Sequence, residues 1–173
     1  MEKVQAGIRD LPVARLTAKG LRWHRTGHPW VYRDDLETDP GAPAGALTAV
    51  FAGDNFLGQA FYSAASRIAL RFATYTGEAV GPDFWEARLQ RALAYRRQVV
   101  HEANAYRLIY GEADGFPGLV VDHYAGHLAM QALHPGMERL LPTITDLLSK
   151  HLAPLSITLR HDAEVRQLEG LPL

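Results

Sequence analysis

The chain has 173 residues, of which 47% are hydrophobic and 21% are charged, and its formal net charge is −1. This composition is typical of a folded globular protein with room for one ordinary domain or two small ones. A net charge near zero excludes nucleic-acid binding driven by the field of the whole chain, so any such binding needs a local basic surface. There is no cysteine, which excludes disulfides, thiolate metal sites and a cysteine nucleophile within these residues.

The N-terminal residues 1–11 are expected to form a loose leader. They lack the basic-then-apolar order of a signal peptide. No apolar run in the sequence approaches the length that spans a bilayer. We therefore expect a cytoplasmic protein with no membrane partner.

Short strands dominate residues 12–78. The alternation over residues 13–18 predicts a strand that Lys19-Gly20 ends, and residues 21–26 predict a short helical turn closed by Gly27. Extended structure resumes at residues 29–32. Further strands are expected at 46–52, 56–62 and 68–76, with Gly53-Asp54-Asn55 as a hairpin turn. This spacing predicts a small β-barrel domain over residues 12–78.

The second half of the chain alternates between helix and strand. A basic helix is expected at residues 83–102, inside a linking segment at 79–104, with Pro82 at its start. Residues 105–173 predict a small α/β domain with the order strand-strand-strand-helix-strand, at 106–110, 118–124, 127–133, 136–152 and 156–161. Pro142 requires that its helix either begins there or kinks. The fold class is therefore α+β.

Basic and aromatic residues are interleaved between Val13 and Arg33, a stretch without acidic residues. Cations attract phosphates and flat rings stack on unpaired bases, so this mixture suits RNA. The alternative is a solvated basic face above aromatic residues of the core, which composition alone favours.

A glycine-rich turn at residues 111–118 carries more acidic groups than a turn needs. Its three glycines and Pro117 supply the positive and the fixed φ angles of a tight connection. Glu112, Asp114 and Asp122, with His123, could bind Mg²⁺ or share a proton. Ordinary turn chemistry and backbone capping explain the same residues more simply.

Other motifs of catalysis are missing from the sequence. It has no glycine-rich dinucleotide fingerprint, no phosphate-binding P-loop and no nucleophile elbow. We therefore expect no catalytic residues, no cofactor and no metal site in this chain. Asp162, Arg166 and Glu169 have the spacing of an ordinary salt-bridged helical turn.

Several motifs together resemble one family. In the first half of the chain they are Ala18-Lys19-Gly20 with His28-Pro-Trp-Val-Tyr32, and Tyr62-Ser63 with residues 66–71. The longest motif is Arg107-Leu-Ile followed by Gly111-Glu-x-Asp-Gly-x-Pro-Gly-Leu119 and Val121-Asp122. The last is Arg160-x-Asp-x-x-x-Arg-x-x-Glu-Gly-Leu171. From about residue 13 onward, the chain resembles the N-terminal portion of the bacterial 23S rRNA cytosine-C5 methyltransferases, which depend on S-adenosylmethionine.

The resemblance implies a PUA-like RNA-binding domain over residues 12–78 and a middle domain over residues 105–173. It implies RNA contacts in the first domain by Lys19, Arg22, Arg25, His28, Trp30 and Arg33. It also implies an interdomain or RNA cleft near Glu112, Asp114, Asp122, Asp162 and Arg166. The full-length parent would use S-adenosylmethionine and would carry a methyltransferase domain in cis, so we expect the chain to be truncated before that domain.

Two other functions stay open from the residues. The chain could be a protein-interaction module that docks a catalytic partner, which an exposed apolar strip around Leu168, Leu171 and Leu173 would support. It could also be a metal-assisted hydrolase that uses Glu112, Asp114 and Asp122. Two exposed sheets would also allow a homodimer.

Overall fold

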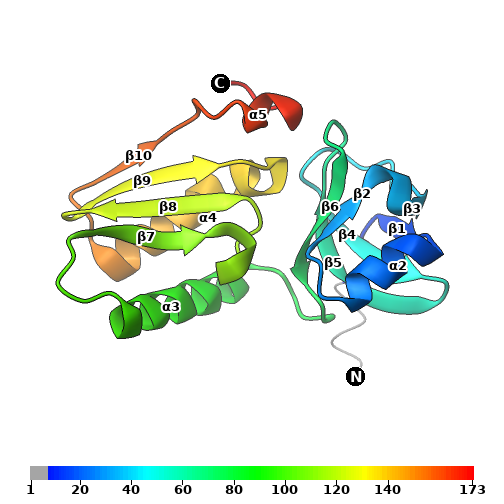
Figure 1. The fold of residues 1–173 in the computed structure, drawn as a ribbon, viewed down its shortest axis with the longest axis horizontal. Helices are drawn as coiled ribbons and strands as arrows, with labels where there is room; N and C mark the ends of the chain where they lie inside the picture. Colours follow the sequence, from blue (N-terminus) through cyan, green and yellow to red (C-terminus); the bar gives the residue numbers. More distant parts are fainter. Residues whose placement is uncertain (1–7) are drawn as a thin grey trace. The chain divides into compact units, whose positions relative to one another are not determined.

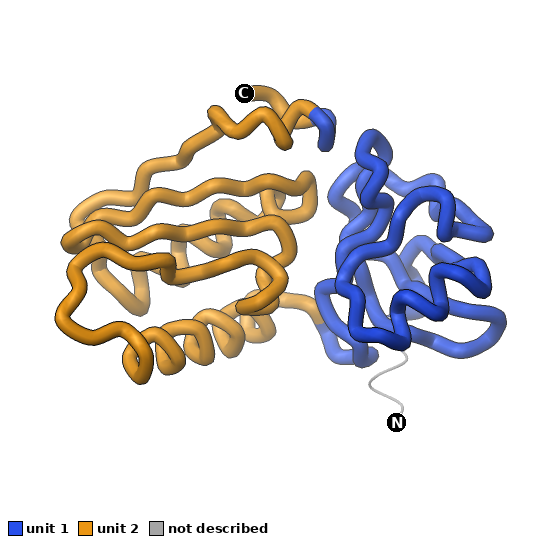
Figure 2. The backbone as a smooth tube through the Cα atoms, in the orientation of Figure 1, with its two compact units in different colours: residues 1–79, 168–170 blue, residues 80–167, 171–173 orange. Residues whose placement is uncertain are grey.

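The computed structural model describes residues 8–173. The chain divides into two compact units, which Figure 2 colours separately. Unit 1 comprises the described residues up to Ala79 together with Leu168–Gly170, and unit 2 comprises Val80–Gln167 and Leu171–Leu173. Of the leader expected over residues 1–11, residues 1–7 lie outside the described part. The division into leader, first domain, linking helix and second domain stays a prediction.

Unit 1 is a curled β-sheet with one short helix (Figure 1). The strand order is β2-β6-β5-β4-β1-β3, and the neighbours are antiparallel except for the parallel pair β1 and β4. The strands are β1 (Val13–Leu16), β2 (Trp30–Tyr32), β3 (Leu36–Thr38), β4 (Leu47–Ala52), β5 (Asn55–Tyr62) and β6 (Ile68–Thr74). Between them lie the helix α2 (Ala18–Arg25) and the 3₁₀ turn η1 (Arg33–Asp35).

The core of unit 1 is built from alternate residues of these strands. Because successive side chains of a strand point to opposite faces, each pair two residues apart lies on the same side of the sheet. The buried cluster consists of Ala14, Leu16, Val31, Val50, Ala60, Tyr62, Leu70 and Phe72. This packing leaves most polar side chains of α2 and of the β2–η1 segment exposed, whereas Asp35 of η1 is buried.

The β1–α2 junction differs from the sequence prediction. The strand ends at Leu16, and the helix already begins at Ala18, because Thr17 caps it: the Thr17 hydroxyl oxygen accepts a hydrogen bond from the Gly20 amide at 3.1 Å. Gly20 therefore lies inside the helix and does not end a strand. A Cβ at Gly20 would lie 2.7 Å from the carbonyl oxygen of Asp35, so only glycine permits this close approach.

Unit 2 contains a four-stranded sheet in the order β10-β9-β8-β7, with β10 parallel to β9 and the other pairs antiparallel. Its strands are β7 (Ala105–Tyr110), β8 (Leu119–Tyr124), β9 (His127–Ala132) and β10 (Ser156–Leu159). Its helical segments are α3 (Pro82–Val99), η2 (Gly111–Asp114), α4 (Pro135–Leu152) and α5 (Val165–Leu168). The predicted α+β class and the predicted order strand-strand-strand-helix-strand are confirmed.

Both long helices of unit 2 pack on the same face of its sheet (Figure 1). Buried side chains of β7, β8 and β9 meet a buried stripe of each helix, which includes Trp85 and Leu89 of α3 and Ile144 and Leu148 of α4. Helix α4 begins at Pro135, so Pro142 lies within it. None of the helices in the described part of the chain combines the length and the apolar content that crossing a bilayer requires.

Candidate nucleic-acid interface

Helix α2 presents a basic face. Lys19, Arg22 and Arg25 are spaced three residues apart, so they lie along one side of the helix, and all three side chains are exposed. The first turn of the helix carries no acidic residue. The close contact of Gly20 with η1 holds the opposite side of the helix against the domain.

Lys19 has a second role on this face. Its ammonium nitrogen lies 2.9 Å from a carboxylate oxygen of Asp35, whose side chain is buried. A buried carboxylate is stable only with a partner, so Lys19 neutralises Asp35 as well as contributing positive charge to the surface. Arg22 and Arg25 are therefore the better probes of ligand binding, because their replacement leaves this pair intact.

Aromatic rings gather around His28, next to α2. The His28 ring lies 6.0 Å from the ring of Trp23, 5.8 Å from that of Trp30 and 6.1 Å from that of Tyr32. Its Nδ1 atom is 3.1 Å from the carbonyl oxygen of Trp30, which fixes the orientation of the imidazole. Trp23 is 51% exposed and Tyr32 is 40% exposed, so two large rings of this cluster are available to a ligand.

Trp30 is more enclosed than its neighbours. The guanidinium of Arg71 lies 5.0 Å from the centre of its ring, in cation–π geometry. Arg71 is buried and forms an ion pair with buried Glu169 at 3.4 Å, within unit 1. Trp30 therefore has a packing role in the domain in addition to the RNA contact predicted for it.

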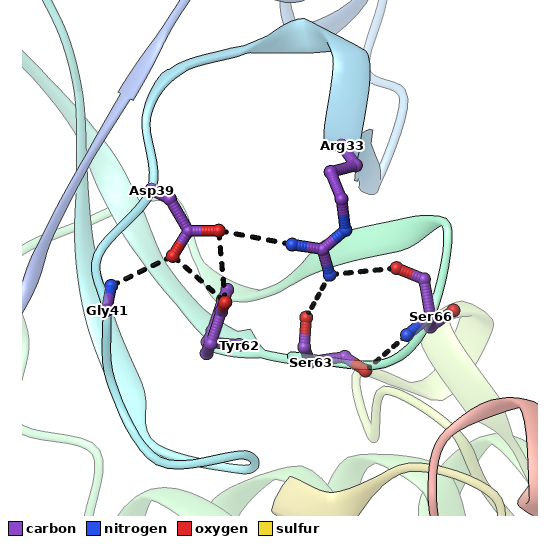
Figure 3. Close-up of polar contacts among 6 residues, drawn as sticks. All are labelled: Arg33, Asp39, Gly41, Tyr62, Ser63 and Ser66. Atoms are coloured by element: carbon purple, nitrogen blue, oxygen red, sulfur yellow. Dashed lines mark hydrogen bonds and ion pairs between the residues drawn. The ribbon is translucent and has the colours of Figure 1, made fainter.

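Arg33 ties together separate segments of unit 1 (Figure 3). Its Nη2 donates to the carbonyl oxygens of Ser63 at 2.6 Å and Ser66 at 2.9 Å, and its Nη1 donates to Asp39 at 3.1 Å. The hydroxyl of Tyr62 donates to the same Asp39 carboxylate at 2.9 Å. A phosphate at Arg33 would have to compete with these hydrogen bonds, and its RNA contact stays a prediction.

A pocket of about 220 Å³ lies beside Arg33. Its lining consists of Tyr32, Arg33, Asp34, Ala65, Ser66 and Arg67. The pairing of β2 with β6, which sets Tyr32 opposite Ile68, brings exposed Arg67 to this place. The sequence prediction missed Arg67, because no local motif connects it to Tyr32; only a predicted β2–β6 pairing could have indicated it.

In unit 2, arginines of α3 hold the glycine-rich turn. Asp114 accepts hydrogen bonds from Arg96 at 2.5 Å and from the Tyr110 amide at 2.7 Å. Arg88 donates to the carbonyl oxygen of Gly115. All three glycines of the turn (Gly111, Gly115 and Gly118) have positive φ, as predicted. Pairing with Arg96 of α3 therefore accounts for Asp114, one of the acidic residues of the turn.

Asp122 lies on β8 and Asp162 follows β10, and each is paired with an arginine. The two oxygens of Asp122 accept from Arg107 Nε at 2.8 Å and Nη2 at 3.1 Å. Asp162 accepts from Arg160 at 2.6 Å, and this hydrogen bond lowers the pKa of Asp162 below its ordinary value. Each carboxylate is thus neutralised by an arginine. Within residues 8–173, no group of three or more histidine and acidic side chains could hold a metal ion.

Arg166 is only 1% exposed and makes contacts entirely within unit 2. Its Nη1 donates to the carbonyl oxygen of Ala132 at 2.5 Å and to Glu138 at 2.8 Å, and its Nε donates to the carbonyl oxygen of Pro172 at 2.9 Å. These bonds give Arg166 a structural role. The structure does not bring it together with Asp122 and Asp162, and the cleft predicted from these residues with Glu112 and Asp114 stays a prediction.

Comparisons with known proteins agree with the architecture of unit 1. Residues 14–75 match the family model described as a PUA-like domain. The predicted PUA-like first domain is therefore confirmed. The match includes α2, the aromatic cluster around His28, and the pocket beside Arg33.

Curated relatives cover most of this chain. Proteins named ribosomal RNA large subunit methyltransferase I are 36% identical over 151 residues in Shewanella amazonensis, 37% over 150 residues in Shewanella denitrificans and 32% over 148 residues in Vibrio campbellii. The alignments include 83–84% of this chain but only 37–38% of each relative. These matches confirm the predicted resemblance at the level of large-subunit rRNA methyltransferases.

A solved structure shares the fold. It is described as a SAM-dependent methyltransferase from Streptococcus mutans, with a TM-score of 0.74 and 15% sequence identity. The likeness covers 86% of this chain and 40% of that one. At this identity the likeness shows the fold alone.

Proposed function

We propose that unit 1 binds ribosomal RNA and positions it for methylation by a SAM-dependent protein to which this chain belongs. The observation that carries the proposal is the exposed face of α2, where Arg22 and Arg25 accompany the half-exposed ring of Trp23. The PUA-like match over residues 14–75 and the rRNA methyltransferase relatives support it.

The chemistry of this face suits folded RNA with unpaired bases. Arginines on one side of a helix neutralise phosphates and release counterions, which makes binding weaken steeply with salt. Trp23 and Tyr32 can stack on bases, which tolerates different sequences because every base has a π-face. Arg67 at the pocket beside Tyr32 offers a further cation to the same strand of RNA.

The methyl-transfer chemistry would lie in another domain, outside these 173 residues. S-adenosylmethionine would supply the methyl group, but the residues of this chain do not fit it: β9 leads into α4 through Leu133 and His134, without the glycine-rich loop of a doubly wound cofactor site. Methylation at C5 of cytosine needs a thiolate to add to C6, and the chain has no cysteine. We therefore propose that a methyltransferase domain in cis provides both.

The test is binding of 23S rRNA fragments to the 173-residue chain, measured by fluorescence anisotropy over a series of salt concentrations. The double variant Arg22→Ala/Arg25→Ala should bind more weakly to every fragment. If both arginines contact phosphates, the slope of log K against log salt should become shallower by roughly 1.4 to 1.8, at about 0.7 to 0.9 for each lost contact.

A matched control is available on α3. Arg91 and Arg97 are also exposed helical arginines, and Arg91→Ala/Arg97→Ala changes the net charge by the same amount. This variant should keep the affinity and the slope of the wild type. Equal losses in both double variants would show that net charge drives binding, and the assignment to α2 would fail. Absence of any salt-dependent RNA binding by the wild type would remove the proposed function itself.

A docking function has some support from the C-terminal residues. Leu168 is 69% exposed and Leu173 is 57% exposed, as a protein-binding module would predict. The docking partner would be a methyltransferase domain, in cis or in trans, or a second copy of the chain. Pull-down of such a domain by the wild type, but not by a Leu168→Ser/Leu173→Ser variant, would favour docking over RNA binding.

A further inference from the structure

The helix-free face of the unit 2 sheet carries exposed aromatic rings. Tyr110 on β7 is 59% exposed and Tyr124 on β8 is 52% exposed. The two helices of the unit pack on the opposite face (Figure 1), where the apolar side chains of the same strands are buried. Exposed rings become informative when they gather around one place on a surface, so the surroundings of these two tyrosines decide what they can do.

A β-bulge brings Tyr110 to this face. Arg107 and Tyr110 are three residues apart, so in a regular strand their side chains would point to opposite faces. The register of β7 with β8 shifts between Arg107 and Ile109, and Leu108 and Ile109 are both buried. The shift places the Tyr110 side chain on the same face of the sheet as that of Arg107. The Arg107 guanidinium lies 5.2 Å from the centre of the Tyr110 ring.

These residues surround a hollow of about 400 Å³, here called the β7–β8 hollow. Its lining consists of Ala105, Tyr106, Arg107, Tyr110, Asp122 and Tyr124. The volume falls within the range of small-ligand sites, at roughly 300 to 1,000 Å³. The lining combines tyrosine rings with one arginine and one aspartate.

Asp122 fixes the orientation of the Arg107 guanidinium. Two of its nitrogens bind the two oxygens of Asp122, so the guanidinium plane is fixed while its charge is balanced. Its Nη1 has no hydrogen-bond partner in the described part of the chain, which leaves donors for an acceptor on a ligand. A fixed guanidinium plane next to a tyrosine ring is a surface on which a nucleobase stacks.

We propose that the β7–β8 hollow stacks an unpaired base of RNA on Tyr110 beside the Arg107 guanidinium, with Tyr124 lining the far end of the hollow and Arg107 donating to an acceptor atom of the base or its ribose. The inference rests on the proposed function, because it takes the same substrate class. It adds a second RNA contact, which lies in unit 2. This contact differs from the one at α2 because it binds a base and neutralises little phosphate charge. Its contribution to affinity should therefore depend little on salt.

The test compares substitutions in the 173-residue chain with a single-stranded oligonucleotide that carries the fluorescent base 2-aminopurine. Tyr110→Ala/Tyr124→Ala should lower the affinity by about 5- to 150-fold, the range expected for loss of one stacked base, with an unchanged salt slope. Binding should quench the fluorescence of 2-aminopurine in the wild type and in Tyr110→Phe/Tyr124→Phe, but not in the alanine variant. Thermal melting checks that both variants stay folded.

Tyr95 provides the matched control, because it is 54% exposed on α3 and lies outside the hollow. Tyr95→Ala should bind like the wild type. Wild-type affinity and quenching in Tyr110→Ala/Tyr124→Ala would overturn the inference, and if Arg22→Ala/Arg25→Ala still lost affinity, the proposed function would survive. Loss of binding to a protein partner, without an effect on RNA, would identify the hollow as a docking site instead. No RNA binding by the wild type would overturn both proposals.

Discussion

The arginines of α2 and those of the unit 2 sheet show how the same side chain serves different purposes. Arg22 and Arg25 extend into water from a helix whose first turn has no carboxylate, so their charge is available to a polyanion. Arg107 and Arg160 each hold an aspartate, so their side of the sheet is almost neutral. Under the proposals made above, RNA would use the first surface through phosphates and the second through bases. The number of arginines in a segment therefore says little about RNA binding until their partners are known.

The largest effect should come from the arginine that is furthest from solvent. Arg166→Met removes the partner of Glu138 and the donor to two carbonyl oxygens, which should cost about 3 kcal/mol of unfolding free energy. This value lies at the low end for a broken buried pair, because Glu138 is 30% exposed and water can solvate it. Thermal or urea denaturation measures the loss.

Arg160→Met is the control for Arg166→Met, because both side chains of the Arg160–Asp162 ion pair are exposed. It should leave the denaturation midpoint nearly unchanged. If the two variants melted alike, the hydrogen bonds of Arg166 would not stabilise unit 2, and its assignment as a structural residue would be wrong.

An intermediate effect should separate Arg33 from Arg22, two residues that the sequence placed in the same RNA surface. Arg33→Ala leaves the carbonyl oxygens of Ser63 and Ser66 without their donor, which should cost about 1 to 3 kcal/mol of unfolding free energy. Arg22→Ala should change stability by less than about 0.5 kcal/mol but should weaken RNA binding. Denaturation and anisotropy on both variants give the comparison. A stable Arg33→Ala variant with weakened binding would show that Arg33 acts on RNA directly.

The smallest effect should be a pH dependence in unit 1. Burial, with a contribution from neighbouring Arg25, lowers the pKa of His24 below its ordinary value of 6.5. The unfolded chain therefore binds a proton more readily than the folded domain. The stability linked to His24 is complete above about pH 6.5 and declines as the pH falls toward the folded pKa.

His24→Phe should flatten this pH dependence in thermal melts between about pH 7.5 and about pH 5.5, because Phe fits beside the rings of Phe72 and Tyr75 without titrating. His101→Phe, at an exposed histidine, should leave the dependence as in the wild type. If the His101 variant flattened the curve and the His24 variant did not, burial of His24 would not be its cause.

Much of the fold could be predicted from the sequence, because the period of the apolar residues is a local property. Alternation located every strand of the curled sheet except β3, which was not predicted, and the stripe at three- and four-residue spacing located α4. The β1–α2 junction was predicted wrongly, since Gly20 was taken as a strand terminator. Its actual role depends on the carbonyl group of Asp35, fifteen residues away, which no local pattern contains.

The candidate site was predicted less completely. The basic and aromatic residues before Arg33 could be picked out because they are neighbours in sequence, and the rings of Trp23, Trp30 and Tyr32 lie around that of His28. Their contacts with RNA stay a prediction. Arg67 and the β7–β8 hollow were missed. Both depend on strand pairing, and Tyr110 reaches its face only because a bulge shifts the register by one residue.

By itself, the sequence determined most of the secondary structure, the basic character of residues 19–25, and the resemblance to rRNA methyltransferases, since periodicity, composition and motifs are carried by residues close together in the chain. Only the tertiary structure decided which charges face water. Arg33 and Arg166 have the same side chain as Arg22, but carbonyl oxygens and carboxylates from distant segments bind them. Hydrogen-bond partners and burial arise from the packing of remote segments, and they determine whether an arginine stabilises the fold or remains available to RNA.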